Sequence, residues 1–210
     1  MASLILDEIE ARVLGCLIEK DLTTPDYYPL SLNALVNACN QKSNREPATN
    51  YDEQTVLDAI DRLRHKSLAT VTTGSEHRVP KYGHRAYETL DLGRREIAVL
   101  TPMLLRGAQT LNELKVRTER MYSFDDTDAV LSAIHKLAAH EGGPFAVELP
   151  RQTGMRETRY THLFFGEPAM PPAAHEPAGV PAPREDRLAK LEAEVEALKA
   201  QFAEFRKQFE

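Results

Sequence analysis

Amide, hydroxyl and cationic side chains are concentrated in the stretch NACNQKSNREPATNYD, at residues 37–52. Such side chains suit contacts with the phosphate oxygens and base edges of nucleic acid. Asparagine also caps helices and satisfies the backbone of turns, which accounts for Asn50 and is an open alternative for Asn40. A tight helix-turn-helix needs only about three or four turn residues, so part of the stretch is surplus to the fold. We therefore predict nucleic-acid contacts from four consecutive residues: Lys42, Ser43, Asn44 and Arg45.

A second group of cations lies further along the chain, in a predicted β-hairpin. Between Arg62 and Arg95 there are eight Lys or Arg residues and three acids, in a chain whose net charge is −6. The overall charge argues against sequence-blind attraction to nucleic acid, but it leaves room for a local basic patch. We predict phosphate contacts from this hairpin, the alternative being an ordinary solvated basic surface. The residues concerned are Arg78, Lys81 and Arg85.

The helix between these two groups has a polar outward face. Gln54 and Arg62 are candidates for DNA contacts, because the recognition helix of a helix-turn-helix presents such side chains to the groove. The same face contains Asp58 and Asp61, which would meet the phosphates unfavourably. An ordinary solvated face with pairs of charges four residues apart is therefore at least as well supported.

The sequence lacks the residue patterns of common enzymes and metal sites. We find no glycine-rich phosphate loop and no HExxH motif. The two cysteines, Cys16 and Cys39, have no metal-ligating neighbour at the usual spacing and fall on apolar helical faces. We predict that they are reduced core residues, with a disulfide as the alternative. A Ser/His/Asp arrangement built from distant residues stays open. The expectation is a non-enzymatic protein without a metal or cofactor.

The sequence also predicts a cytoplasmic location. No apolar run approaches the ~20 residues that a membrane span requires. The N-terminus, MASLILDEIEARVL, has acids where a secretion signal would have basic residues, which is typical of the start of a folded helix.

An internal repeat organises the elements that must position these residues. VLGCLIEK at 13–20 corresponds to VLTPMLLR at 99–106, SLNAL at 31–35 to TLNEL at 110–114, and VLDAIDRL at 56–63 to VLSAIHKL at 130–137. A weaker fourth match pairs RAYETL at 85–90 with TRYTHL at 158–163. The offsets are then 86, 79, 74 and 73, which fall steadily, so the first copy is the longer one.

Each copy predicts three helices followed by a β-hairpin, because apolar residues recur with a helical period and β-rich runs follow them. We expect the second helix to begin at Ser31, and the third near Asn50, with Glu53 completing a capping box. In the second copy Thr110 and Glu113 form the capping box. The expected strands are LATVTT and HRAYETL in the first copy, and PFAVEL and RYTHLFF in the second.

Three helices and a hairpin form the winged-helix arrangement. The predicted fold class is therefore mainly α with small β-hairpins (α+β), in two tandem winged-helix domains at residues 1–90 and 91–166. Residues 167–183 are rich in proline and alanine and predict an extended linker. Residues 184–210 predict a heptad-repeat helix that self-associates as a coiled coil, making the protein at least a dimer. Its apolar seam is Leu188, Leu191, Val195, Leu198, Phe202, Phe205 and Phe209.

The run TTPDYYPLSLNALVNACNQKSNREP, followed by the helix that contains VLDAIDRL, resembles the YceH-like family of bacterial proteins. The resemblance covers roughly residues 4–166 and excludes the linker and the heptads. It implies two winged helices in each chain, a cytoplasmic location and DNA binding by analogy of fold. It implies no catalytic residue and no ligand.

Two functions remain open at this stage. The first is a protein that binds double-stranded DNA. Its role would then be transcriptional regulation. The second is a protein-interaction module, like the winged-helix partners of bacterial condensins. The net charge, the acidic face of the third helix and the heptads favour the second. A continuous positive surface would favour DNA, and an apolar patch would favour a protein partner.

Overall fold

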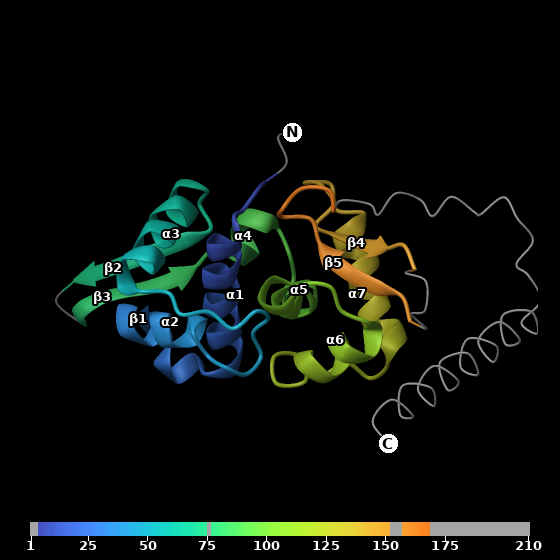
Figure 1. Cartoon of the computed structure of the whole chain (residues 1–210), viewed down its shortest axis with the longest axis horizontal. Helices are drawn as coiled ribbons and strands as arrows, with labels where there is room; N and C mark the ends of the chain where they lie inside the picture. The colour runs from blue at the N-terminus through green and yellow to red at the C-terminus, as the bar shows by residue number, and fades with distance from the viewer. Residues whose placement is uncertain (1–3, 75–76, 152–156, 169–210) are drawn as a thin grey trace, which may run out of the picture. The chain divides into compact units, whose positions relative to one another are not determined.

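The computed structural model describes residues 4–74, 77–151 and 157–168, and these residues form a mixed α+β structure (Figure 1). They lie in one compact unit, Met1–Pro168, which holds both copies of the repeat. Within the described ranges there are seven α-helices and two small antiparallel sheets. None of those helices is long and apolar enough to cross a membrane. The predicted heptad seam and residues 169–183 of the predicted linker lie outside the described residues.

The first copy of the repeat is built from helices with clear N-terminal caps. Asp7 and Glu10 form a reciprocal capping box at the start of α1, and Ser31 caps α2 as predicted. The third helix begins later than predicted, because Asp52, not Asn50, accepts the backbone N–H of Thr55 at 2.8 Å. The elements are α1 (Glu8–Thr23), the 3₁₀ helix η1 (Pro25–Tyr27), β1 (Leu30–Ser31), α2 (Leu32–Cys39), α3 (Glu53–His65), β2 (Ala69–Gly74), β3 (His77–His84) and α4 (Ala86–Leu90).

The second copy repeats this order in a shorter form. Thr110 and Glu113 form the predicted capping box at the start of its second helix. Gln109 makes an isolated antiparallel bridge to Tyr160, where the first copy has the short strand β1 paired with β3. The elements are α5 (Arg94–Arg106), α6 (Leu111–Thr118), α7 (Thr127–Ala138), β4 (Ala146–Leu149) and β5 (Arg159–His162).

The third helices of the two copies bury equivalent residues, which confirms the helical part of the repeat. The offset of 74 relates the buried positions of α3 to those of α7. The aligned residues Leu57 and Leu131 are only partly buried and pack against the core. The buried sets are Val56, Ala59, Ile60 and Leu63 in α3, and Val130, Ala133, Ile134 and Leu137 in α7.

The predicted match between the strands is wrong by several residues. RAYETL contains helix α4, not a strand, whereas TRYTHL contains strand β5. The structurally equivalent segments are KYGH at 81–84 and RYTH at 159–162, with an offset of 78. Leu30 and Gln109 pair with the buried Tyr82 and Tyr160, which occupy the same place in their sheets. The offsets therefore do not fall steadily.

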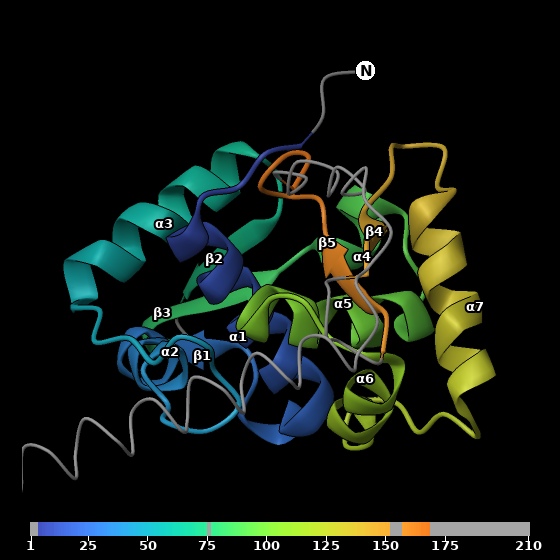
Figure 2. The same ribbon diagram turned by 45° about the vertical axis from the view of Figure 1, so that its right-hand side comes forward.

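The first helices of the two copies pack against each other at the centre of the unit, with α3 and α7 on opposite outer sides (Figures 1 and 2). Gly15 of α1 makes this close approach possible, because a Cβ there would lie 2.8 Å from Cδ2 of Leu105 in α5. The copies also share backbone hydrogen bonds. Leu6 donates to Phe164 O at 2.7 Å, and Glu46 donates to Leu105 O at 2.9 Å. The two copies are thus joined along their cores.

Candidate nucleic-acid contacts and a cationic pocket

The connection between α2 and α3, at residues 40–52, is ordered by polar groups that lie beneath it. The amide of Asn40 donates to Tyr51 O and accepts from Tyr51 N, both at 2.8 Å. Arg12 of α1 is buried and donates to Pro47 O at 2.7 Å and to Cys39 O at 3.2 Å. These contacts give Asn40 the structural role that the sequence left open.

Arg45 is buried, so its predicted contact with DNA is wrong. Only 3% of the residue is exposed, and its Nη2 lies 2.6 Å from Oε2 of Glu19 in α1. Its Nε donates to Ala38 O at 3.0 Å. Burial alone would raise the pKa of Glu19, but the hydrogen bond and charge of Arg45 outweigh it, and the pKa lies below its usual range. Arg45 is therefore a positioning group for the loop, and its donors point inward.

Lys42, Ser43 and Asn44 remain exposed, as predicted. Asn44 has φ of 58°, a left-handed conformation that asparagine tolerates better than most residues. The side chain of Lys42 makes no ion pair with any residue that the structure describes. These three residues form one wall of the pocket described below.

The polar side chains on the outward face of α3 contact other groups of the chain. Gln54 donates to Oδ1 of Asp58 at 2.8 Å, and Arg64 lies 3.0 Å from Asp61. Arg62 lies 3.1 Å from Asp7 and 3.6 Å from the buried Glu10. Gln54 and Arg62 are thus engaged by carboxylates within the chain. Gln54 pairs four residues along α3, as in the solvated-face alternative, whereas the carboxylates near Arg62 come from the start of α1 and not from α3.

The cations of the first hairpin are arranged differently. Arg78 is exposed in β3, and Lys81 is half-buried in the same strand, in register with Ser31 of β1 and Thr72 of β2. Lys81 therefore lies at the centre of the three-stranded sheet. Arg85 is also exposed, but it lies directly after β3 at the N-cap of α4 and not on the hairpin as predicted. Among the described residues, none of the three cations has an acidic partner. As far as the described residues show, these three positive charges are open to an external anion.

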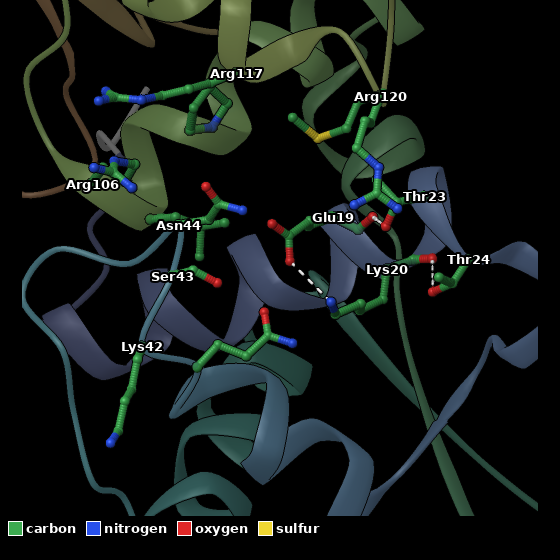
Figure 3. A pocket seen from close by; sticks show the side chains of 14 residues that line it. Glu19, Lys20, Thr23, Thr24, Lys42, Ser43, Asn44, Arg106, Arg117 and Arg120 are labelled. Carbon is green, nitrogen blue, oxygen red and sulfur yellow. Dashed lines mark hydrogen bonds and ion pairs between the residues drawn. The ribbon is translucent and has the colours of Figure 1, made fainter.

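A further group of cations, which the sequence analysis did not assemble, lines a pocket between the two copies (Figure 3). The pocket has a volume of about 520 Å³ and lies where the ends of α1, α5 and α6 meet the loop after α2. Lys20 lies in the last turn of α1 and Arg106 is the last residue of α5, at positions related by the offset of 86, so the repeat could have indicated that these two cations lie close together. The basic residues of the lining are Lys20, Lys42, Arg106, Arg117 and Arg120.

The charge balance of this pocket is unequal. Its single carboxylate, Glu19, is contacted by Arg45 and by Lys20 at 3.4 Å. Arg117 lies 3.3 Å from Glu113, and its buried Nη1 has no hydrogen-bond partner among the described residues. Burial, and then the like charge of Arg106, lower the pKa of Arg117. The pocket is thus a region of unbalanced positive charge.

Other candidate chemistry is sparse in the part of the chain that the structure describes. Cys16 and Cys39 are both buried and are not joined by a disulfide, as predicted. No group of three or more His, Cys, Asp or Glu side chains in the described ranges could hold a metal ion.

A family model described as "Protein of unknown function, DUF480" matches residues 6–155. The chain is 52% identical over 209 residues to a UPF0502 protein of Solibacter usitatus, with 98% of each chain covered. It is 51% identical over 195 residues to a UPF0502 protein of Opitutus terrae, covering 93% of this chain and 84% of the relative. A UPF0502 protein of Aeromonas hydrophila is 51% identical over 204 residues, covering 94% of this chain and 93% of the relative. The names of these relatives state no activity and no ligand.

Proposed function

The chain belongs to the DUF480 family of bacterial proteins, and we propose that it is a cytoplasmic, non-enzymatic protein that binds double-stranded DNA through tandem winged helices. The resemblance of residues 24–47 to the YceH-like family supports the same assignment. Self-association through the heptads of residues 184–210 is part of this proposal.

The order of elements supports the winged-helix part. In the first copy a short strand lies between helices one and two, and the hairpin follows helix three. The resulting sheet order is β1-β3-β2. In the second copy Gln109 takes the place of the short strand by its bridge to Tyr160. A hairpin that follows a helix-turn-helix is the element that extends along DNA as a wing.

The observation that carries the DNA proposal is the set of cations on the first hairpin and directly after it. Arg78 and Arg85 are exposed, Lys81 is half-exposed, and none has an acidic partner among the described residues. The face of α3, by contrast, presents Asp58 and Asp61. The proposed mode is therefore contact with the phosphate backbone by the wing, without insertion of α3 into the major groove. Such binding is steeply salt-dependent and only weakly selective for sequence.

The test is fluorescence anisotropy with a labelled duplex over a salt series. Replacing Arg78, Lys81 and Arg85 together by glutamine should weaken binding and flatten the log–log salt slope by roughly two to three, since each phosphate contributes ~0.9. A control with Lys136→Gln and Arg151→Gln removes two exposed cations of the second copy and should leave the slope unchanged. The DNA proposal fails if the wild-type protein binds no duplex at low salt.

The acidic face of α3 favours a second function, a protein-interaction module. Glu53, Asp58 and Asp61 are exposed on one helix, which would suit a partner with a basic surface. Charge reversal by Asp58→Lys with Asp61→Lys should then abolish capture of the partner. Under the DNA proposal the same change should strengthen duplex binding or leave it unaltered.

A further inference from the structure

We infer that the cationic pocket between the two copies binds a small organic phosphate of about the size of a mononucleotide. The pocket is separate from the wing, and the inference does not depend on DNA binding. Its walls come from four places in the chain: the end of α1, the loop after α2, the end of α5 and the end of α6 (Figure 3). One ligand in it would therefore touch both copies.

The cations that line the pocket lack counter-charge among the described residues. Arg106 and Arg120 make no side-chain hydrogen bond or ion pair with any described residue, and Lys42 is likewise without an acidic partner. Glu19 cannot neutralise them, because Arg45 and Lys20 already occupy its oxygens. An anion in the pocket would supply the missing charge.

Two guanidinium groups of like charge, those of Arg106 and Arg117, lie close together at the pocket. Arg117 is close enough to Arg106 to be influenced by its charge, and Figure 3 shows the two guanidinium groups on the same side of the pocket. Arg117 Nη1 is buried and lacks a partner within the part of the chain that the structure describes, an arrangement that costs free energy unless an acceptor binds there. A phosphate can accept several hydrogen bonds from two guanidinium groups at once, which a single carboxylate does less well.

The rest of the pocket lining is partly apolar and partly polar without charge. Pro102, Leu105 and Met121 provide an apolar surface, while Ser43, Asn44, Thr23 and Thr24 provide hydroxyl and amide groups. Small-ligand sites combine such surfaces in volumes of roughly 300–1,000 Å³, and about 520 Å³ falls in this range. A lone inorganic ion would leave the apolar part unused. The lining therefore fits a molecule with a phosphate at one end and an uncharged, partly apolar group at the other.

The experiment is isothermal titration calorimetry of the full chain with AMP, pyrophosphate and adenosine. We expect AMP to bind most tightly, pyrophosphate to bind more weakly, and adenosine to give no measurable heat. Arg106→Gln and Arg120→Gln should each weaken AMP binding at least about tenfold, because each removes a charge-assisted contact. The wing variant Arg78→Gln should bind AMP as the wild type does. Thermal melts verify that each variant is folded, and Arg120, being exposed, is the safer of the two pocket changes.

Two results would overturn the inference: no binding of AMP or pyrophosphate at millimolar concentration, or unchanged AMP affinity in the double variant of Arg106 and Arg120. A DNA phosphate shares the ligand chemistry, so a duplex is added as a competitor at low salt. Displacement of AMP by duplex, together with a loss of DNA binding in the pocket variants, would assign these cations to DNA instead. Binding of AMP by a protein that binds no duplex would support the pocket and overturn the proposed function.

Discussion

The two copies of the repeat have the same order of helices and strands, but they differ after the second helix. In the first copy the connection at residues 40–52 is held by two buried arginines, Arg12 and Arg45. In the second copy the shorter connection contains Tyr122 and Phe124, whose ring centroids lie 4.7 Å apart, with the guanidinium of Arg95 near both rings. The two copies thus have the same core arrangement but different residues in this loop. Loops are the segments in which functional residues most often vary.

The first helices show which residues accompany the longer loop. The offset of 86 places Ala98 and Leu105 of α5 at the positions of Arg12 and Glu19 in α1. In the first copy, Arg12 and Glu19 of α1 contact the long polar loop. In the second copy, where the loop is shorter, apolar residues stand at the two equivalent positions.

Other charges are kept in both copies. Glu10 lies 3.6 Å from Arg62, and Glu96 lies 3.5 Å from Lys136, at positions related by the repeat. A pair that occurs in both copies is explained by the common fold, and this favours a structural role for Arg62.

The largest expected effect is on the buried arginine of the first loop. Arg45→Ala should lower the free energy of unfolding by about 3–5 kcal/mol, because it leaves the carboxylate of Glu19 largely buried without its main partner. The exposed neighbour Lys42→Ala should change it by less than about 0.5 kcal/mol. Urea denaturation measures both. A cost below about 1 kcal/mol for Arg45→Ala would mean that the loop is not held through this contact.

The next largest effect is on the pH dependence of folding stability, which we expect to arise from His84 and His162, two residues at equivalent positions in the copies. In both, Nδ1 accepts a backbone N–H two residues further on, from Ala86 at 3.1 Å and from Phe164 at 3.2 Å. Burial lowers the pKa of His162 to about 4 and also lowers the pKa of His84, although Asp21 lies 3.3 Å from His84 and opposes that shift.

A lowered histidine pKa means that the unfolded chain binds more protons than the folded one between the two pKa values. Stability should therefore be full above pH 6.5 and should fall as the pH drops towards 4, by up to about 3 kcal/mol for His162. His162→Asn keeps a hydrogen-bond acceptor and should flatten this pH dependence. Chemical denaturation from pH 7.5 to 4 is the measurement, and an unchanged slope in the variant would exclude His162 as the cause.

A smaller effect is expected from Glu10 and Glu96, which occupy equivalent positions in the two copies: replacing each by glutamine should lower the stability by different amounts. Glu10 is 1% exposed, lies 2.6 Å from Lys66 and also accepts from the N-cap residue Asp7. Glu10→Gln should cost about 1–2 kcal/mol, since contacts to a charged group are lost. Glu96→Gln should cost less than about 0.5 kcal/mol, because its partner Lys136 is exposed and solvent screens the pair. Equal costs in thermal melts would contradict this contrast.

The smallest effects are expected from the two cations of the repeated pair. Arg62→Ala and Lys136→Ala should each change stability by less than about 1 kcal/mol, because the cation of each pair is partly exposed to solvent although its carboxylate is buried. Neither should alter the salt slope of duplex binding. A loss of about one unit in the slope for Arg62→Ala alone would restore this residue as a phosphate contact.

Much of the helical structure could be predicted from the sequence, because caps and apolar periods act over a few residues. Ser31, Thr110 and Glu113 were assigned correctly as caps, and the equivalent faces of α3 and α7 were identified from VLDAIDRL and VLSAIHKL. The strands were harder, since the apparent match of RAYETL to TRYTHL concealed the true equivalence of KYGH and RYTH. Which of two similar short runs forms a strand depends on its pairing with residues such as Leu30 and Gln109, which are distant in the chain.

The sequence by itself determined the three main helices of each copy and their order, since these depend on neighbours within a turn or two, but it predicted a strand where α4 lies. Only the tertiary structure decided the fate of individual charges. Lys42 and Arg45 look alike in the sequence, yet one is exposed and the other buried, because Glu19 meets Arg45 from a helix 26 residues away. The pocket has the same origin, because the packing of α1 against α5 brings Lys20, Lys42 and Arg106 to one place. Local patterns fix where a side chain leaves the backbone, but its partners are set by segments that meet only when the core forms.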